Sequence, residues 1–179
     1  TKFYRLFDVD TDFGGLDIHK LRHVITPTVT YSYIHPPTVS PSKLIQFDEI
    51  DAIDRKDALT FELENKLQTK RGGTSVDLLR FLISTDYLLK YKPEQGKFRF
   101  NHVKADLELH PYHWLSLYAD SDYDTTIKKF STANFDLAAN GGDKWYIGAG
   151  QRFERNISNQ TTAEFAYRFN PKWKLRVYQ

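Results

Sequence analysis

The last nineteen residues, "TTAEFAYRFNPKWKLRVYQ" at 161–179, alternate apolar and polar side chains on both sides of a short break. One parity holds Phe165, Tyr167, Leu175 and Val177, and the other holds Glu164, Arg168, Lys174 and Arg176. A period of two is the period of a β-strand, whose successive side chains point to opposite faces. The stretch therefore predicts a hairpin with two unlike faces.

The same alternation recurs along the whole chain and predicts no helix of ordinary length. The expected strands lie near residues 3–9, 18–34, 58–70, 75–91, 97–109, 114–123, 128–139, 145–154, 161–169 and 173–179. In the fifth of these, Phe98 and Phe100 are out of phase with Val103 and Leu107, and a β-bulge near Asn101 would reconcile the two halves. The sequence thus predicts one all-β segment over residues 1–179.

The composition narrows the classes of protein. With 27% charged residues and no apolar stretch of about eighteen residues, the chain is not a helical membrane protein. A mean hydropathy of −0.56 is compatible with a transmembrane β-barrel, because only every second residue of each strand faces lipid. The absence of cysteine excludes disulfides and zinc-thiolate sites, and a net charge of +2 gives no reason to expect nucleic acid as a partner.

The breaks between the expected strands alternate between two kinds. Tight breaks are expected at 71–73, 110–113, 140–144 and 170–172, and longer polar breaks at 35–58, 92–97, 121–129 and 155–160. Short turns at one end and longer loops at the other are typical of an up-and-down barrel in an outer membrane. We therefore expect an antiparallel transmembrane β-barrel, of which this chain supplies about ten strands.

The three tryptophans support this interpretation. Trp114, Trp145 and Trp173 each follow a tight break, and "LHPYHWLSLY" at 109–118 resembles "FNPKWKLRVY" at 169–178. Strands that begin after turns at one end would place the three indoles at one height, as a membrane-water interface selects. They are the predicted interface girdle.

The polar parity mixes both signs of charge, which suits a hydrated lumen. Its predicted members are Lys20, Arg22, Glu62, Glu64, Lys66, Arg80, Asp86, Lys104, Asp106, Glu108, Asp120, Asp136, Arg152, Glu164, Arg168, Lys174 and Arg176. Four charged residues of the opening stretch, Glu164, Arg168, Lys174 and Arg176, are expected to face that lumen. In a soluble sandwich the same side chains would face bulk water.

Several patterns resemble catalytic or metal sites without supporting one. His19 and His23 have the spacing of a helical zinc pair, but in a strand that spacing is about 13 Å. The acidic run "FDEIDAIDRKD" at 47–57 lacks the glycine and spacing of a calcium loop, and its apolar residues predict a short helical turn instead. Gly148 and Gly150 are expected to relieve crowding on the concave side of the sheet. We expect no enzymatic activity, no cofactor and no metal.

Residues 21–71 resemble the barrel domain of the LptD (OstA or Imp) family of lipopolysaccharide-assembly outer-membrane proteins. The similar features are the strand from Ile25 to Tyr33 around Pro27, the loop pair Phe47-Asp48, the strand end from Asn65 to Arg71, and the hairpin from Pro171 to Trp173. The domain-linking cysteines of many members are absent, because the chain has none.

This resemblance implies a location in the cell outer membrane and a role in inserting lipopolysaccharide into its outer leaflet. It also implies three kinds of partner, namely lipopolysaccharide itself, the plug lipoprotein LptE with the periplasmic Lpt bridge proteins, and outer-membrane lipid. On this interpretation the chain is a piece of a larger barrel, truncated at both ends. The alternatives are a small self-contained outer-membrane barrel, serving as a pore or adhesin, and a soluble β-sandwich binding protein.

Overall fold

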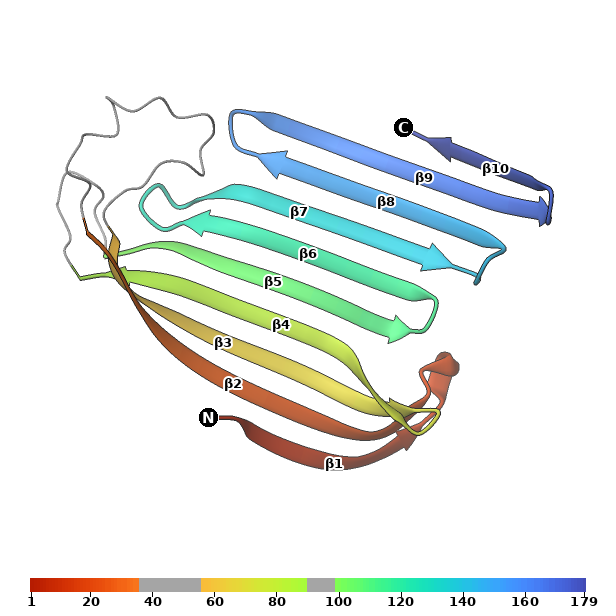
Figure 1. Ribbon diagram of the computed structural model, residues 1–179, viewed down its shortest axis with the longest axis horizontal. Helices are drawn as coiled ribbons and strands as arrows, with labels where there is room; N and C mark the ends of the chain where they lie inside the picture. Colours follow the sequence, from red (N-terminus) through yellow and green to blue (C-terminus); the bar gives the residue numbers. More distant parts are fainter. Residues whose placement is uncertain (36–55, 90–98) are drawn as a thin grey trace.

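A computed structural model describes residues 1–35, 56–89 and 99–179. These residues form one antiparallel sheet of ten strands in sequence order (Figure 1). The strands are β1 (Phe3–Thr11), β2 (Ile18–Ile34), β3 (Lys56–Arg71), β4 (Thr74–Leu88), β5 (Phe100–Tyr112), β6 (Leu115–Asp124), β7 (Lys129–Asn140), β8 (Trp145–Glu154), β9 (Ser158–Asn170) and β10 (Trp173–Tyr178). The all-β, up-and-down arrangement predicted from the alternation is confirmed.

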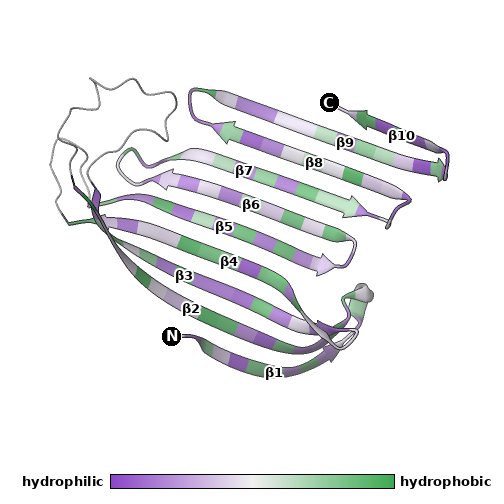
Figure 2. Ribbon diagram, in the orientation of Figure 1, coloured by the Kyte–Doolittle hydropathy of each residue, from purple (hydrophilic) through white to green (hydrophobic). Residues whose placement is uncertain are grey.

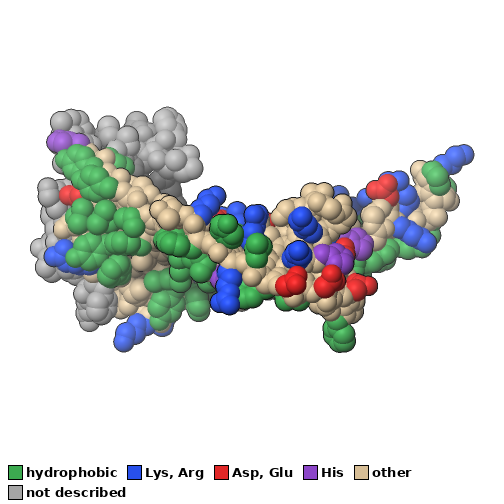
Figure 3. Space-filling view, turned by 90° about the horizontal axis from the view of Figure 1, so that it is seen from below, with side chains coloured by type: hydrophobic (Ala, Val, Ile, Leu, Met, Phe, Trp, Pro, Cys, Tyr) green, Lys and Arg blue, Asp and Glu red, His purple; other side chains and the backbone are tan. Residues whose placement is uncertain are grey.

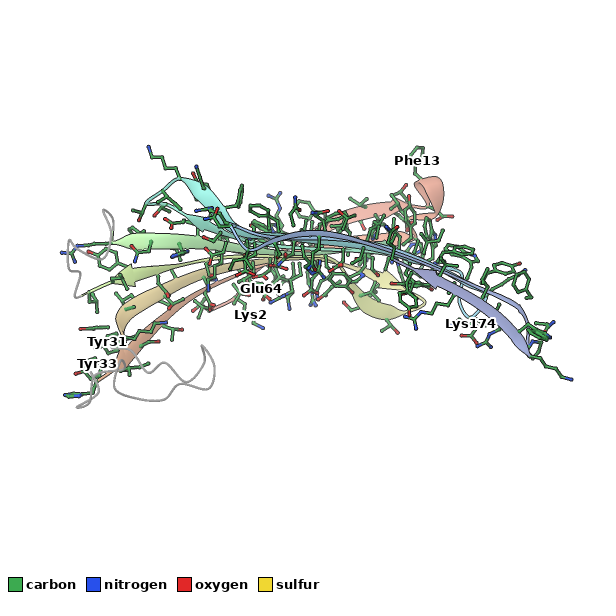
Figure 4. All side chains as sticks on the ribbon, turned by 90° about the horizontal axis from the view of Figure 1, so that it is seen from above. Lys2, Phe13, Tyr31, Tyr33, Glu64 and Lys174 are labelled. Atoms are coloured by element: carbon green, nitrogen blue, oxygen red, sulfur yellow. The ribbon has the colours of Figure 1, made fainter. Side chains whose placement is uncertain are left out.

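The sheet is open. Strands β1 and β10 are its two edges, and the two termini lie on opposite sides of it (Figure 1). The ten strands do not close into a barrel, and the expectation that they form part of a larger one stays a prediction. Seen along its edge, the sheet is a single layer with side chains on both sides and no second layer of described residues over either face (Figure 4).

A single layer leaves almost nothing to serve as a core. Among the described residues, only Ala58, Thr69, Leu78, Gly150 and Ala166 are buried. Within the described ranges, the single helical element is the three-residue 3-10 turn Phe13–Gly15 between β1 and β2. None of the helices in the described part of the chain is long and apolar enough to cross a membrane.

The connections lie at two ends of the sheet, which we call the turn end and the loop end. The turn end holds the links β1–β2, β3–β4, β5–β6, β7–β8 and β9–β10, and the loop end holds the other links (Figure 1). Pro111 and Pro171 lie at the turn end together, as expected, although Pro111 belongs to β5 and the turn itself is His113–Trp114. The break expected at 110–113 is thus placed too early.

The predicted contrast in connection length is wrong for two loop-end links. Strands β6 and β7 are separated only by residues 125–128, and β8 and β9 only by residues 155–157. The first link is short because Asp124 Oδ1 accepts hydrogen bonds from the backbone N–H of Thr126 (2.8 Å) and Ile127 (3.1 Å). An aspartate that closes a turn in this way lets the polar residues on either side join the strands. Of the expected longest loop at 35–58, residues 36–55, with the expected helical turn, lie outside the described residues, whereas Lys56, Asp57 and Ala58 belong to β3.

The predicted bulge in β5 is confirmed. Thr85 pairs with Val103, but two residues further along β4 Tyr87 pairs with Phe100, so β5 has one extra residue at Asn101–His102. The backbone carbonyl of His102 accepts a hydrogen bond from Thr85 Oγ1 at 2.8 Å. The bulge changes the phase of β5 and puts Phe100 beside Tyr87, with ring centroids 5.1 Å apart.

Candidate functional site

The candidate site is the pair of unlike faces that the strand register creates. On one face, directly paired residues run across seven strands as Leu67, Leu79, Leu109, Leu117, Leu137, Ala149 and Ala163. Their chain neighbours pair across the other face as Lys66, Arg80, Glu108, Tyr118, Asp136, Gly150 and Thr162. We call these the apolar face and the polar face, and their alternation is visible along the strands in Figure 2.

The C-terminal hairpin follows the same division. Leu175 pairs with Tyr167 and Val177 with Phe165 on the apolar face, while Lys174 pairs with Arg168 on the polar face. The polar face also holds Arg176, whose Nε lies 2.7 Å from Glu164 Oε1. The alternation in the sequence therefore assigns these eight side chains to the same two faces as the strand register does.

Aromatic side chains border the apolar face at both ends. At the turn end, Trp114 lies in the β5–β6 turn and stacks on Tyr112 at 5.1 Å, and Trp145 and Trp173 are the first residues of β8 and β10. All three predicted girdle residues are thus at one end of the sheet. Trp114, however, precedes its strand instead of beginning it.

A second aromatic row at the loop end was missed by sequence analysis. Its members are Tyr31, Tyr87, Phe100, Tyr123, Phe130 and Phe153, all on the apolar face. Tyr123 and Phe130 meet edge to face at 5.3 Å. Predicting this row requires the register between strands. Simple alternation does not show it, because the bulges in β5 and β7 change the phase of those strands.

Ion pairs link neighbouring strands across the polar face. Arg80 joins two carboxylates, with Nε 2.7 Å from Glu64 Oε1 and Nη1 2.9 Å from Glu108 Oε1. Arg152 Nη2 lies 2.5 Å from Asp136 Oδ2, and Lys56 Nζ lies 3.5 Å from Asp86 Oδ2. Both signs are distributed over the face, as predicted, with the exception of Lys20, which falls in a register irregularity of β2 with φ +59°.

A hollow of about 600 Å³ lies over the polar face between β3 and β6. Its lining is almost entirely polar and includes Glu62, Asp86, Lys104 and the His102–Asp122 pair, in which Nδ1 and Oδ1 are 2.6 Å apart. Asn101, in the bulge, also lines it, and its buried Oδ1 has no hydrogen-bond partner among the described residues. The hollow thus offers donors and acceptors to a polar ligand, with Leu82 and Leu88 adding apolar surface.

The two glycines of β8 also belong to the polar face. A Cβ at Gly150 would lie 2.7 Å from both Asp136 Oδ1 and Thr162 Oγ1, and one at Gly148 would lie 2.8 Å from the Tyr146 hydroxyl. These positions therefore relieve crowding between strands, which is the role that sequence analysis predicted.

His19 and His23 have separate partners. His19 lies between Asp10 and Asp17, with ring nitrogens 3.0 Å from a carboxylate oxygen of each, whereas His23 Nε2 lies 3.2 Å from Asn65 Oδ1. Acidic and histidine side chains gather there near the β1 edge, toward the turn end (Figure 3). No group of three or more metal-binding side chains is arranged around an ion position in the described residues.

Comparisons of the chain with protein-family models, with curated proteins and with solved structures find no match.

Proposed function

We propose that this chain is a membrane-embedded part of an outer-membrane β-barrel. The observation that carries the proposal is the apolar face, which extends across the sheet between two aromatic rows. Trp145–Phe153 takes nine residues from one aromatic row to the other, and Leu79–Tyr87 and Leu115–Tyr123 are apolar-face stretches of the same length that end in the loop-end row. A tilted strand needs about 9–11 residues to cross the hydrocarbon of a bilayer, and aromatic girdles mark both of its interfaces.

The exposure of this face argues against a soluble sandwich. Phe61, Leu63, Phe135 and Phe165 are each 40% or 41% exposed, although they lie in strands with neighbours on both sides. Soluble monomers rarely expose a continuous apolar patch of more than a few hundred Å². Lipid covers such a face without any second layer of protein.

Within that class, we propose lipopolysaccharide transport, with the sheet forming part of an LptD-like barrel. The support is the resemblance over residues 21–71 together with the mixed charges and the polar hollow of the opposite face. The polar face would line a hydrated lumen for the sugar headgroup, while the acyl chains stay against the apolar side. The plug lipoprotein LptE, the periplasmic Lpt bridge proteins and outer-membrane lipid would be its partners, and no enzymatic step is involved.

A self-contained ten-stranded pore or adhesin is the second candidate. The observation that favours it is the even number of strands, since β1 and β10 run in opposite directions and can pair as antiparallel neighbours. Pairing of the two edges would remove both unpaired edge strands.

The absence of native cysteine gives a direct test of the membrane placement. Single cysteines at Leu137 and Asp136, adjacent in β7 on opposite faces, are introduced into the full-length protein in cells. We expect a lipid-soluble maleimide to label L137C and a water-soluble one to label D136C. Labelling of both sites by the water-soluble reagent alone would contradict a membrane-embedded sheet.

Depletion of the protein separates the two candidate functions. An LptD-like role predicts that newly made lipopolysaccharide fails to reach the cell surface. Normal surface lipopolysaccharide with reduced permeability to small solutes would instead support the pore.

A further inference from the structure

Three cations form a directly paired row at the turn end of the polar face. Lys174 of β10 pairs with Arg168 of β9, and the backbone N–H of Arg168 donates to the carbonyl oxygen of Lys144 at 2.8 Å. Lys144, Arg168 and Lys174 therefore lie side by side on three neighbouring chain segments. Like charges directly opposite each other destabilise a strand pair unless something compensates them.

Elsewhere on this face the arginines have partners. Arg80 and Arg152 pair with carboxylates, Arg176 pairs with Glu164, and Arg22 Nε donates to Gln68 Oε1 at 2.8 Å. Arg168 is the exception, because it has no side-chain hydrogen bond, ion pair or ring contact within the described residues. Glu164 is the nearest acid along β9, but it already binds Arg176 at 2.7 Å.

The row lines a pocket of about 150 Å³. Ala166, 3% exposed, contributes a small side chain beside Arg168, and the turn residues Gly142 and Asp143 complete one wall with Trp145. Tyr146 also lines the pocket, and its hydroxyl reaches toward Gly148, which has no side chain to block it. Asp143 is the single acid among these lining residues, against three bases, and no ion pair joins it to them in the described structure.

We propose that this pocket, formed by Lys144, Arg168 and Lys174, binds a phosphate group. A dianion would offset the repulsion along the row, and its oxygens can accept from the planar guanidinium as well as from the two ammonium groups. The phosphate is either free or carried on a lipid headgroup, because Trp145 and Tyr167 place the pocket at the height of the turn-end aromatic row. Lys174 projects from the C-terminal edge of the sheet, where such a group has access (Figure 4).

The test uses the full chain in micelles of an uncharged detergent. Inorganic phosphate is titrated at constant ionic strength while the backbone amide resonances of Lys144 and Arg168 are followed. We expect saturable shifts at these two residues. The variant K144Q/K174Q should bind phosphate at least about tenfold more weakly, the change expected for loss of two charge-assisted contacts.

The matched control is K128Q/K129Q, which removes two lysines next to the loop-end β6–β7 link and should bind phosphate like the wild type. Tighter binding of short-chain phosphatidic acid than of inorganic phosphate would identify a lipid headgroup, and equal binding would identify the free group. Absence of saturable shifts in the wild type, or equal loss in both variants, would overturn the site. The cysteine labelling of β7 is independent of these results, so failure here leaves the membrane placement standing.

Discussion

Phe135 and Asp136 are adjacent in β7, yet their side chains have opposite surroundings. Phe135 pairs across strands with Ala119 and Gln151 on the apolar face, and is 40% exposed with no layer above it. Asp136 binds Arg152 on the polar face at 2.5 Å. Phe135 thus has no covering layer among the described residues, whereas Asp136 has a charged partner within the sheet. A substitution should therefore have very different costs on the two faces.

The largest effect is expected for Phe135→Arg. Phe135 lies midway between the two aromatic rows on β7, and an arginine at the bilayer midplane costs about 2–4 kcal/mol. The control is Thr132→Arg on the polar face of the same strand, where Asp122 and Glu154 are the paired neighbours. We expect that change to stay within about 0.5 kcal/mol. Equal costs in a lipid-vesicle folding titration would contradict the assignment of the faces.

Arg80→Gln should have the largest effect within the polar face. It removes both bonds of Arg80 and leaves Glu64 and Glu108 without their shared cation, at a cost of about 1–2 kcal/mol. Arg176→Gln breaks one pair whose arginine side chain is 61% exposed, and should cost about 0.5 kcal/mol or less. Chemical unfolding of both variants at low and high salt measures their free energies of unfolding and checks this order. A larger loss of unfolding free energy for Arg176→Gln than for Arg80→Gln would contradict it.

Phe165→Arg should be milder than Phe135→Arg, although both replace a phenylalanine of the apolar face. Phe165 pairs with Ile147, the next pair on the apolar face after Trp145 and Tyr167, so its arginine reaches the interface. The expected cost is about 0–1 kcal/mol, because the penalty falls toward the membrane surface. The same folding titration measures it, and a cost equal to that of Phe135→Arg would show that the turn-end aromatic row does not mark an interface.

The smallest effect, and the one with the opposite sign, is expected for Arg168→Gln in phosphate-free buffer. Removing the middle cation of the Lys144–Arg168–Lys174 row relieves repulsion, so the stability should be unchanged or higher by about 0.2–1 kcal/mol. The gain should shrink as salt is added, since exposed charges are screened. A clear loss of stability would mean that Arg168 has a stabilising partner.

Sequence alternation predicted most of this fold because the strands place mainly apolar side chains on one face of the sheet and mainly polar side chains on the other. The ten strands, the shared faces of the C-terminal hairpin and the bulge near Asn101 all follow from the parity of apolar residues. The parity cannot give the register between strands, which decides that Tyr87 meets Phe100 and that Arg168 meets Lys174. The loop-end aromatic row and the cation row are products of that register, and both were missed.

Two connections were also misjudged, for a related reason. Polar residues, such as those around 121–129 and 155–160, are typical of loops, but in this sheet the ends of strands are polar as well. Asp124 closes its turn through backbone hydrogen bonds and leaves the neighbouring residues in strands.

The loop-end aromatic row has a geometric consequence, because part of it crosses the strands obliquely. From β2 to β5 it follows one line of paired residues, Tyr31, Leu59, Tyr87 and Phe100. Beyond that line the border moves to the pair row of Val103, Tyr123 and Phe130, and then to Phe153, a displacement of two residues per hairpin along β4 and β6. Two residues per hairpin is one residue per strand, or about 3.3 Å along the strand for each spacing of about 4.8 Å between neighbouring strands. The row is therefore inclined by about 35° to the direction perpendicular to the strands. Strands of outer-membrane barrels tilt by about 35–45°. At that inclination nine residues rise about 22–25 Å, so the stagger alone would fit the sheet to the thickness of a bilayer.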